Sequence, residues 1–265
     1  MNEQVVAVTG ASGGIGYAIA AAFAARGWRV YGLSRRDSAP PGVNHIPTDL
    51  TDEAAVKEAF SRIKAEAGQL HILINNAGNG ISGSVEFTQI NDMKAQFEVN
   101  FFAAATCVKY ALPLLRDSHG KILNISSVAA VYPIPFQAFY SASKAALNAL
   151  TLALRNETRA FQISVGGVML GDAETGFTAA RRKQELGDDI YRGAIRRSVA
   201  VMEKDEQKGM NPRLIGEKIC ALCLRRALPP LTTIGGSYKL LVFLGRLLPQ
   251  RLIFFLIGKM YVKRP

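Results

Sequence analysis

Apolar runs and segments of helical periodicity alternate along most of the chain. Short β-branched or aliphatic runs predict strands, and longer segments with apolar residues every three or four positions predict helices. We expect strands at 5–9, 29–33, 44–47, 71–74, 120–125 and 162–168, and helices at 15–26, 52–67, 89–116, 138–160 and 213–227. This alternation predicts an α/β fold in which helices cover both faces of a parallel sheet.

Length and composition are those of one globular domain. The chain has 265 residues, of which 49% are hydrophobic and 20% charged, so a disordered protein is excluded. Cys220 and Cys223 form a C-x-x-C without a second pair or a nearby histidine, so we expect packing rather than a metal or redox site. The first expected strand begins at Val5, which leaves no room for a signal peptide and predicts a cytoplasmic protein.

The positive charge is concentrated at one end of the chain. Nine of the 32 Lys and Arg residues lie from Lys218 onward with no Asp or Glu among them, and the rest carries 23 basic and 21 acidic residues. This distribution argues against nucleic-acid binding. Arg246, Pro249 and Arg251 interrupt the apolar, basic segment 237–265, so it is a poor membrane span. It fits one or two helices lying on an anionic membrane surface, or packing against protein, and both alternatives stay open.

A glycine-rich turn follows the first expected strand. The run Thr9-Gly10-Ala11-Ser12-Gly13-Gly14-Ile15-Gly16 leads into an Ala-rich helix that Gly27 ends. Glycines let the backbone turn sharply and approach a pyrophosphate, and a helix N-terminus offers N–H groups to it. The order strand, glycine turn, helix therefore predicts a dinucleotide site, although the spacing differs from G-x-G-x-x-G.

Tyr140 and Lys144 stand four residues apart in an expected helix, so they share one face. A nearby ammonium group favours the phenolate and lowers the pKa of a tyrosine, which would make the phenol an acid/base group near neutral pH. Alone, the pair could equally be an exposed tyrosine beside a solvated lysine.

The T-G-x-x-x-G-x-G turn and the Y-x-x-x-K pair together resemble the short-chain dehydrogenase/reductase family. Asn75-Asn76-Ala77-Gly78, Asn100 in FEVNFF, and Ser127 thirteen residues before Tyr140 match further motifs, so the resemblance spans residues 9–175. NNAGNGISGSVE and SSVAAVYPIPFQAFYSASKAAL are most similar to the 17β-hydroxysteroid-dehydrogenase-like branch. The resemblance implies a Rossmann-type doubly wound sheet in a single domain (1–236, with a substrate lid at 176–212). The apolar, basic segment 237–265 would follow this domain as a helical tail. The resemblance also implies a homodimer or homotetramer.

The resemblance also implies a reaction, namely hydride transfer between nicotinamide C4 and a carbonyl or carbinol carbon. Tyr140 would exchange the proton, and Lys144 would lower the Tyr140 pKa and bind the nicotinamide ribose. Ser127, or Ser126 in its place, would bind the substrate oxygen, and Asn100 would hold a water that links Lys144 to solvent. The implied cofactor-binding residues are Gly10, Ser12, Gly13, Gly14, Ile15, Gly16, Ser34, Arg35, Arg36, Asp49, Leu50, Asn76, Ala77, Gly78, Tyr140, Lys144, Gly171 and Thr175.

The end of the second expected strand favours NADP(H) over NAD(H). Ser34 takes the place of the acid that binds a ribose hydroxyl in NAD enzymes, and Arg35 can grip a 2′-phosphate bidentately. Asp37 follows, where it would pair with one of the arginines. Asp49 would meet the adenine, unless it caps a helix in competition with neighbouring residues.

Two features bear on the substrate. Leu170 replaces the proline that the family usually has before Gly171, which we expect to provide special backbone geometry, and the lid is rich in charge. Apolar residues between Val131 and Phe139 are compatible with a lipid- or steroid-like carbonyl substrate, although a small ketone or a fatty-acyl-derived carbonyl stays open.

A sensor that binds NADP(H) with weak turnover is the competing class. The presence of all four catalytic residues argues against it.

Overall fold

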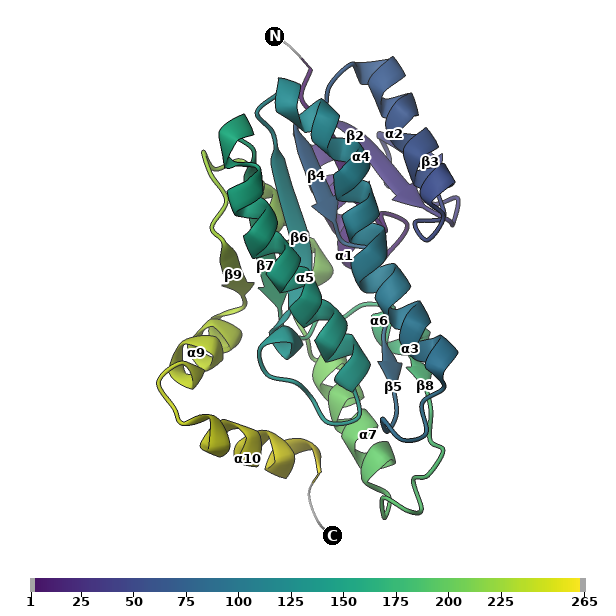
Figure 1. Cartoon of the computed structure of the whole chain (residues 1–265), viewed down its shortest axis with the longest axis vertical. Coiled ribbons are helices and arrows are strands. Elements are labelled where there is room, and N and C mark those ends of the chain that lie inside the picture. Colours follow the sequence, from purple (N-terminus) through teal and green to yellow (C-terminus); the bar gives the residue numbers. More distant parts are fainter. Residues whose placement is uncertain (1–2, 263–265) are drawn as a thin grey trace.

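A seven-stranded parallel sheet forms the centre of the computed structural model, which describes residues 3–262 (Figure 1). The strand order is β3-β2-β1-β4-β6-β7-β9. Strands are added on one side of β1 up to β3 and on its other side from β4 onward, so the order of the strands reverses between β1 and β4. In such sheets ligands bind beyond the carboxyl ends of the strands at this reversal. The bounds are β1 Val5–Thr9, β2 Arg29–Ser34, β3 Val43–Pro47, β4 Ile72–Asn75, β6 Lys121–Ser127, β7 Ser164–Leu170 and β9 Leu231–Ile234.

Helices cover both faces of the sheet, as the alternating pattern predicts. One face carries α1 (Gly14–Ala24) and α8 (Pro212–Cys223), and the other carries α2 (Glu53–Ala67), α4 (Ala103–Asp117) and α5 (Ala138–Glu157). Successive residues of β1 feed the two cores in turn, because side chains alternate across a strand. The Rossmann-type, doubly wound fold is therefore confirmed.

The cysteines of the C-x-x-C motif pack in the core between α8 and α1. Cys220 and Cys223 are buried free thiols, and burial raises the pKa of both. Gly216 permits the close approach of the two helices, since a Cβ there would lie 2.6 Å from the Ala18 carbonyl carbon. Their expected packing role is confirmed. Within residues 3–262 no cluster of His, Cys, Asp or Glu side chains is placed to hold a metal ion.

The expected single helix 89–116 is wrong in one respect. It is divided into α3 (Ile90–Phe97), a π-helical segment η1 (Glu98–Phe102) and α4. A π segment inserts an extra residue into the helical turn and is frequent at functional sites. Here it carries Asn100, whose side chain is buried.

The sequence pattern did not predict three short strands, because each is brief and lacks a clear alternation of apolar and polar residues. β9 extends the sheet beyond β7, and its four residues lie between a Pro-Pro and a Gly-Gly pair. β5 (Ile81–Ser82) and β8 (Arg182–Lys183) form a separate two-stranded sheet that attaches the lid segment to the chain after β4.

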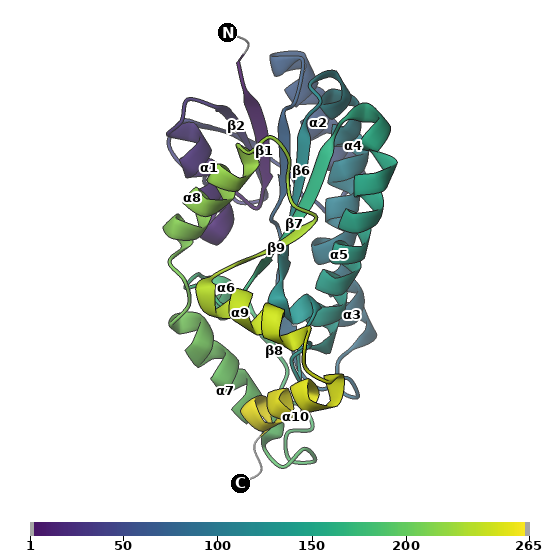
Figure 2. The same cartoon turned by 90° about the vertical axis from the view of Figure 1, so that its left-hand side faces the viewer.

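The lid and tail lie beyond the carboxyl ends of the strands (Figure 2). The lid contains α6 (Phe177–Ala180) and α7 (Ala194–Gln207), and the tail contains α9 (Gly236–Gly245) and α10 (Gln250–Tyr261). The prediction of one or two tail helices is thus met by a pair, although residues 263–265 lie outside the described range. None of the helices within residues 3–262 has the length and apolar character needed to span a bilayer.

Candidate active site

The glycine turn forms a cradle between β1 and α1. Gly10 and Gly14 have φ angles of +69° and +54°, a region that favours glycine. A Cβ at Gly16 would lie 2.3 Å from the Gly10 carbonyl oxygen, so only glycine fits. Gly13 precedes α1 without a side-chain cap, which leaves the first N–H groups of the helix open to an anion. These features fit the pyrophosphate of a dinucleotide.

Thr9 ties this cradle to the loop after β4. Its hydroxyl accepts hydrogen bonds from the backbone N–H groups of Asn76 (2.9 Å) and Ala77 (3.0 Å). The Asn76 side chain donates in turn to the Thr9 carbonyl oxygen at 3.0 Å. Asn76 was predicted to bind the cofactor, and the structure places its side chain against the glycine turn. Thr9, which the motifs marked only as the first residue of the turn, is the centre of this contact.

Tyr140 and Lys144 share one face of α5, with Lys144 Nζ 6.0 Å from the centre of the Tyr140 ring. Nζ donates to the Ile125 carbonyl oxygen at 2.9 Å, and burial lowers the Lys144 pKa to about 8. Burial raises the pKa of Tyr140 to about 12. Loss of hydration therefore dominates the Tyr140 pKa in this structure, and the lowering expected from Lys144 stays a prediction.

Asn100 lies close to Lys144 and is held on both sides. Its Oδ1 accepts from the Asn79 N–H at 2.9 Å, while Nδ2 donates to the Asn79 carbonyl oxygen (3.1 Å) and to Ser143 Oγ (3.0 Å). A Cβ at Gly78 would lie 3.1 Å from Asn100 Oδ1 and 3.4 Å from Lys144 Nζ. The π segment, α5 and the loop after β4 thus meet at one point.

Ser126 and Ser127 are the last two residues of β6, and their hydroxyl groups have different partners. The Ser127 hydroxyl accepts from the Ala129 N–H at 3.1 Å, and its interaction with Tyr140 lowers the tyrosine pKa against the larger effect of burial. The Ser126 hydroxyl is buried and donates to the Lys144 carbonyl oxygen at 3.3 Å. Of the two alternatives, Ser127 is the one beside Tyr140.

Ser34, the last residue of β2, and the residues that follow it contact different partners. Ser34 Oγ lies 3.0 Å from His45 Nε2, and His45 Nδ1 lies 3.2 Å from an Asp37 carboxylate oxygen. The expected pairing of Asp37 with an arginine is therefore wrong. Within residues 3–262, neither Arg35 nor Arg36 takes part in an ion pair. Arg36 Nη2 would lie 3.1 Å from a Cβ at Gly13, so Arg36, rather than Arg35, reaches the glycine turn.

Asp49 does not cap a helix. Its Oδ1 accepts from the Thr51 N–H (3.0 Å) and hydroxyl (2.8 Å), and these bonds lower the Asp49 pKa, with a further contribution from Arg35. Asp52 caps α2 by accepting from the Ala54 N–H at 2.9 Å. The capping alternative for Asp49 is thereby removed, and Asp49 and the adjoining Leu50 stay predicted adenine contacts.

Gly171 has a different role from the one expected. Its φ lies outside the left-handed region, but a Cβ would approach the Tyr238 ring to 2.2 Å. The glycine accommodates a tail side chain, and the Tyr238 hydroxyl also bonds to the Asp172 carboxylate. Burial raises the pKa of Asp172 and of Tyr238. Thr175 lies 3.5 Å from the position of a Cβ at Gly14, so it does reach the glycine turn.

A buried ion pair in the lid lies near Tyr140. The Arg181 side chain is fully buried and pairs with Glu206, which joins α6 to α7. Phe177 packs edge-on against the Tyr140 ring with centroids 5.8 Å apart. The charges of Glu206 and Arg181 respectively raise and lower the Tyr140 pKa. Sequence reasoning missed these lid residues, since the charge-rich segment gave no indication of which arginine would be buried.

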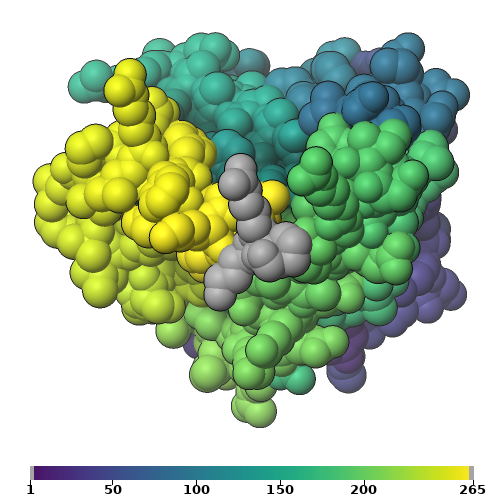
Figure 3. Space-filling view, turned by 90° about the horizontal axis from the view of Figure 1, so that it is seen from below, coloured from purple at the N-terminus to yellow at the C-terminus, as the bar shows by residue number. Residues whose placement is uncertain are grey.

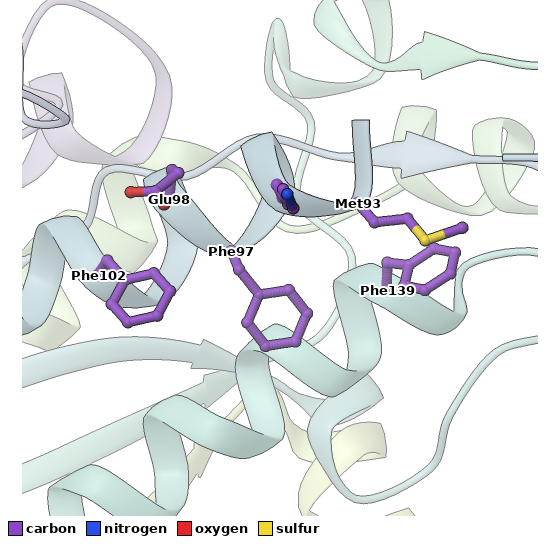
Figure 4. A pocket seen from close by; sticks show the side chains of 6 residues that line it. Met93, Phe97, Glu98, Phe102 and Phe139 are labelled. Carbon is purple, nitrogen blue, oxygen red and sulfur yellow. The ribbon is translucent and has the colours of Figure 1, made fainter. Parts of the chain in front are cut away.

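An apolar groove with a volume of about 320 Å³ lies beside α3 and the start of α5 (Figure 4). It contains none of the predicted site residues. The residues that line it are Met93, Lys94, Phe97, Glu98, Phe102 and Phe139.

Comparisons with known proteins agree with this geometry. Residues 4–186 match the family profile described as short chain dehydrogenase. The chain is similar to a 3-ketodihydrosphingosine reductase of Bacteroides thetaiotaomicron, with 38% identity over 91% of each chain. It is also similar to an NADPH-dependent 1-acyldihydroxyacetone phosphate reductase of Schizosaccharomyces pombe, with 35% identity over 65% of this chain and 61% of that one. A short-chain dehydrogenase from Streptomyces avermitilis superposes with a TM-score of 0.83 and 27% identity, covering 98% of this chain and 97% of that one.

Proposed function

The chain belongs to the short-chain dehydrogenase family, and on this premise we propose that it is an NADP(H)-dependent reductase of apolar, lipid-like carbonyl compounds. Membership makes it an oxidoreductase that acts on CH–OH groups with NAD(P). The observation that supports the proposed site is the convergence of Asn100 Oδ1 and Lys144 Nζ beside Gly78, with Ser127 next to Tyr140. The finer resemblance to the 17β-hydroxysteroid-dehydrogenase-like branch stays a prediction.

The glycine cradle and Arg36 would hold the cofactor, which supplies a hydride at nicotinamide C4. Open N–H groups at the start of α1 would bind the pyrophosphate, and the Arg36 guanidinium, near Gly13 and free of ion pairs within residues 3–262, would bind a 2′-phosphate. Lys144 would bind the nicotinamide ribose, and Thr175, beside the glycine turn, would meet the carboxamide.

Tyr140 is suited to proton donation during carbonyl reduction. A pKa of about 12 keeps its hydroxyl protonated at neutral pH, so the proton is available when the carbonyl oxygen gains negative charge. The Ser127 hydroxyl, beside Tyr140, would donate a hydrogen bond to the same oxygen. Lys144 is mostly protonated at neutral pH and would return a proton to Tyr140 after the reduction. Asn100 would hold the water that links Lys144 to solvent.

The substrate proposal rests on relatives and on the tail. The relatives named above act, by their names, on 3-ketodihydrosphingosine and on 1-acyldihydroxyacetone phosphate, both of which combine a carbonyl with a long chain. We therefore favour a long-chain carbonyl compound over a small ketone. Such a substrate partitions into membranes, and the predicted peripheral membrane contact through 237–265 would give the enzyme access to it.

The reaction is tested by NADPH consumption with a panel of long-chain ketones, steroids and small aldehydes. Tyr140→Phe should remove most turnover and retain NADPH binding, because the ring remains while the proton is lost. Tyr110→Phe is the matched control, since it removes the same hydroxyl group from a tyrosine of α4 that bonds to Glu53 of α2, away from the proposed proton path. Near-normal rates in Tyr140→Phe would refute the mechanism, and NADPH binding without turnover on the whole panel would favour a sensor.

The cofactor preference is tested with arginine variants. Arg36→Ala should raise the KM for NADPH by about 10- to 100-fold with little change for NADH, since a charge-assisted hydrogen bond contributes about 1.5–3 kcal/mol. Arg62→Ala, an arginine on α2, serves as the control. A tenfold or larger preference of the unmodified protein for NADH would be roughly a 1.4 kcal/mol difference in the wrong direction and would overturn the proposal.

We expect a homodimer or homotetramer, as is common in the family. The apolar groove bounded by Phe97, Phe102 and Phe139 is a candidate part of the subunit contact. Light scattering of the full chain, compared with Phe102→Ser, would test whether this surface joins subunits. A monomeric unmodified chain would contradict the expectation.

A further inference from the structure

The tail is held to the enzyme by a narrow inner stripe. One residue per helical turn faces inward, and these residues pack beside Val128, Tyr132 and Met169. The Tyr132 hydroxyl donates to the Val242 carbonyl oxygen at 3.3 Å, and only a glycine at 245 lets the helix approach the same hydroxyl. The inward residues are Tyr238, Val242, Gly245, Ile253 and Ile257.

The outer face of α9 and α10 is apolar as well. Half of the exposed large hydrophobic side chains within residues 3–262 lie between 240 and 260, with exposed fractions from 40% to 68%. Exposed apolar residues are ordinary when scattered, but a continuous patch of this kind marks an interaction surface. The outer face comprises Leu240, Leu241, Phe243, Leu244, Leu247, Leu248, Leu252, Phe254, Phe255, Leu256 and Met260.

The charges of the outer face have one sign. Lys239, Arg246, Arg251 and Lys259 are exposed among the apolar residues, and segment 237–265 contains no Asp or Glu. Lys259 Nζ lies 5.0 Å from the centre of the Phe255 ring, so cation and apolar surface are neighbours. Apolar side chains interspersed with cations match the boundary between anionic lipid headgroups and acyl chains.

A second copy of the chain fits this surface less well. A two-fold symmetric contact places the same patch on both sides, so the cations of one tail would face those of the other. The face provides no carboxylate to pair with them. Like charges brought together across an interface oppose association.

We propose that the outer face of α9 and α10 docks flat on an anionic lipid bilayer and holds the lid and the carboxyl end of β7 next to it. Tyr238 of α9 stacks on Gly171 and bonds to Asp172, directly after β7, and α10 packs against α7 of the lid. Figure 3 shows tail and lid together on the underside of the molecule. The docking itself stands on the surface alone, whereas entry of substrate from the bilayer rests on the proposed function.

The test is flotation of the full chain with phosphatidylcholine vesicles, with and without phosphatidylglycerol. We expect binding to the anionic vesicles, weaker binding to the neutral ones, and loss of the difference at high salt. Arg246→Gln/Arg251→Gln should weaken binding to anionic vesicles about 30-fold, since each cation near a membrane surface contributes about 1 kcal/mol. Phe254→Ser/Phe255→Ser should weaken binding to both vesicle types.

Matched controls carry the same changes on another face. Leu214→Ser/Leu224→Ser alters exposed apolar residues of α8 and its end, and Lys57→Gln/Lys64→Gln removes two exposed cations from α2. Both should bind vesicles as the unmodified chain does. NADPH binding and urea unfolding of every variant show that it is folded.

Three results would overturn the proposal. The first is that the unmodified chain binds NADPH but not vesicles. The second is that the tail variants and the control variants weaken vesicle binding equally. The third is that the unmodified chain binds no vesicles and forms a dimer that Phe254→Ser/Phe255→Ser abolishes. The last result would identify a second copy as the occupant of the face. Tyr140→Phe should dock normally, because docking does not depend on proton transfer. An unmodified chain that docks but turns over no carbonyl of the panel would refute the proposed function and leave the docking intact.

Discussion

Gly171→Ala should detach the tail from the active site. The backbone at Gly171 tolerates an alanine, but the new Cβ would lie 2.2, 2.3 and 2.4 Å from three atoms of the Tyr238 ring. Ordinary contacts between carbon atoms are about 3.5–4.0 Å, so the ring must retreat by more than about 1 Å. That movement also strains the hydrogen bond between Tyr238 and Asp172.

The size of the effect follows from these two contributions. Overpacking costs about 1–3 kcal/mol, and loss of a buried hydrogen bond adds about 1 kcal/mol. We expect a total of about 2–4 kcal/mol against tail docking. The tail can undock without unfolding the sheet, so the effect should appear first as local opening.

Trypsin cleavage after Arg246 and Arg251 measures this opening. When opening is fast, cleavage follows the population of the open form, so 2 kcal/mol corresponds to about 30-fold faster cleavage. Gly171→Ala/Tyr238→Ala should cleave no faster than Tyr238→Ala alone, because the ring that clashes is gone. Gly176→Ala is the control, since a Cβ there meets nothing within 4 Å. Unchanged cleavage in Gly171→Ala, or no rescue in the double variant, would refute the reasoning.

Three further predictions concern the centre of the site. Thr9→Val should lower the free energy of unfolding in urea by about 2–4 kcal/mol, because the N–H groups of Asn76 and Ala77 lose their acceptor, while Thr9→Ser should lose much less. A loss below about 1 kcal/mol would contradict this. The kcat for reduction should fall as pH rises through about 8, because Lys144 becomes neutral there while Tyr140 stays protonated to about 12. A kcat that stays constant up to about pH 10 would show that the charge of Lys144 is not needed for turnover. Glu206→Gln should destabilise the fold by about 3–5 kcal/mol because it leaves the buried Arg181 cation without its partner, and urea unfolding unaffected by this change would show that the pair is dispensable.

Much of the fold follows from local patterns. The six expected strands all form, because buried parallel strands require apolar runs that are visible in the sequence. The glycine turn also follows from local rules, since Gly10 and Gly14 adopt the left-handed backbone that their residue type permits. Ser127 was preferred over Ser126 by spacing alone, and it is the serine that lies beside Tyr140.

The unpredicted features depend on residues far apart in the sequence. Tyr238 meets Gly171 across 67 positions, so nothing near the glycine indicates why a side chain is excluded there. Arg181 is one of several arginines in the lid, and only the packing of α6 on α7 buries it. The raised pKa of Tyr140 likewise arises from burial, which spacing between tyrosine and lysine does not report.

The π-helical segment around Asn100 sets the number of residues between α3 and α4 with which the asparagine reaches its partners. One residue advances an α-helix by about 100°, so removing one from 98–102 would rotate Asn100 away from Asn79 and Ser143 while allowing ordinary helical hydrogen bonds. A shorter chain here would form the more regular helix and lose the asparagine from the site. In the proposed mechanism, helical regularity and turnover therefore make opposite demands on the length of this segment, so a stabilising deletion here should cost activity.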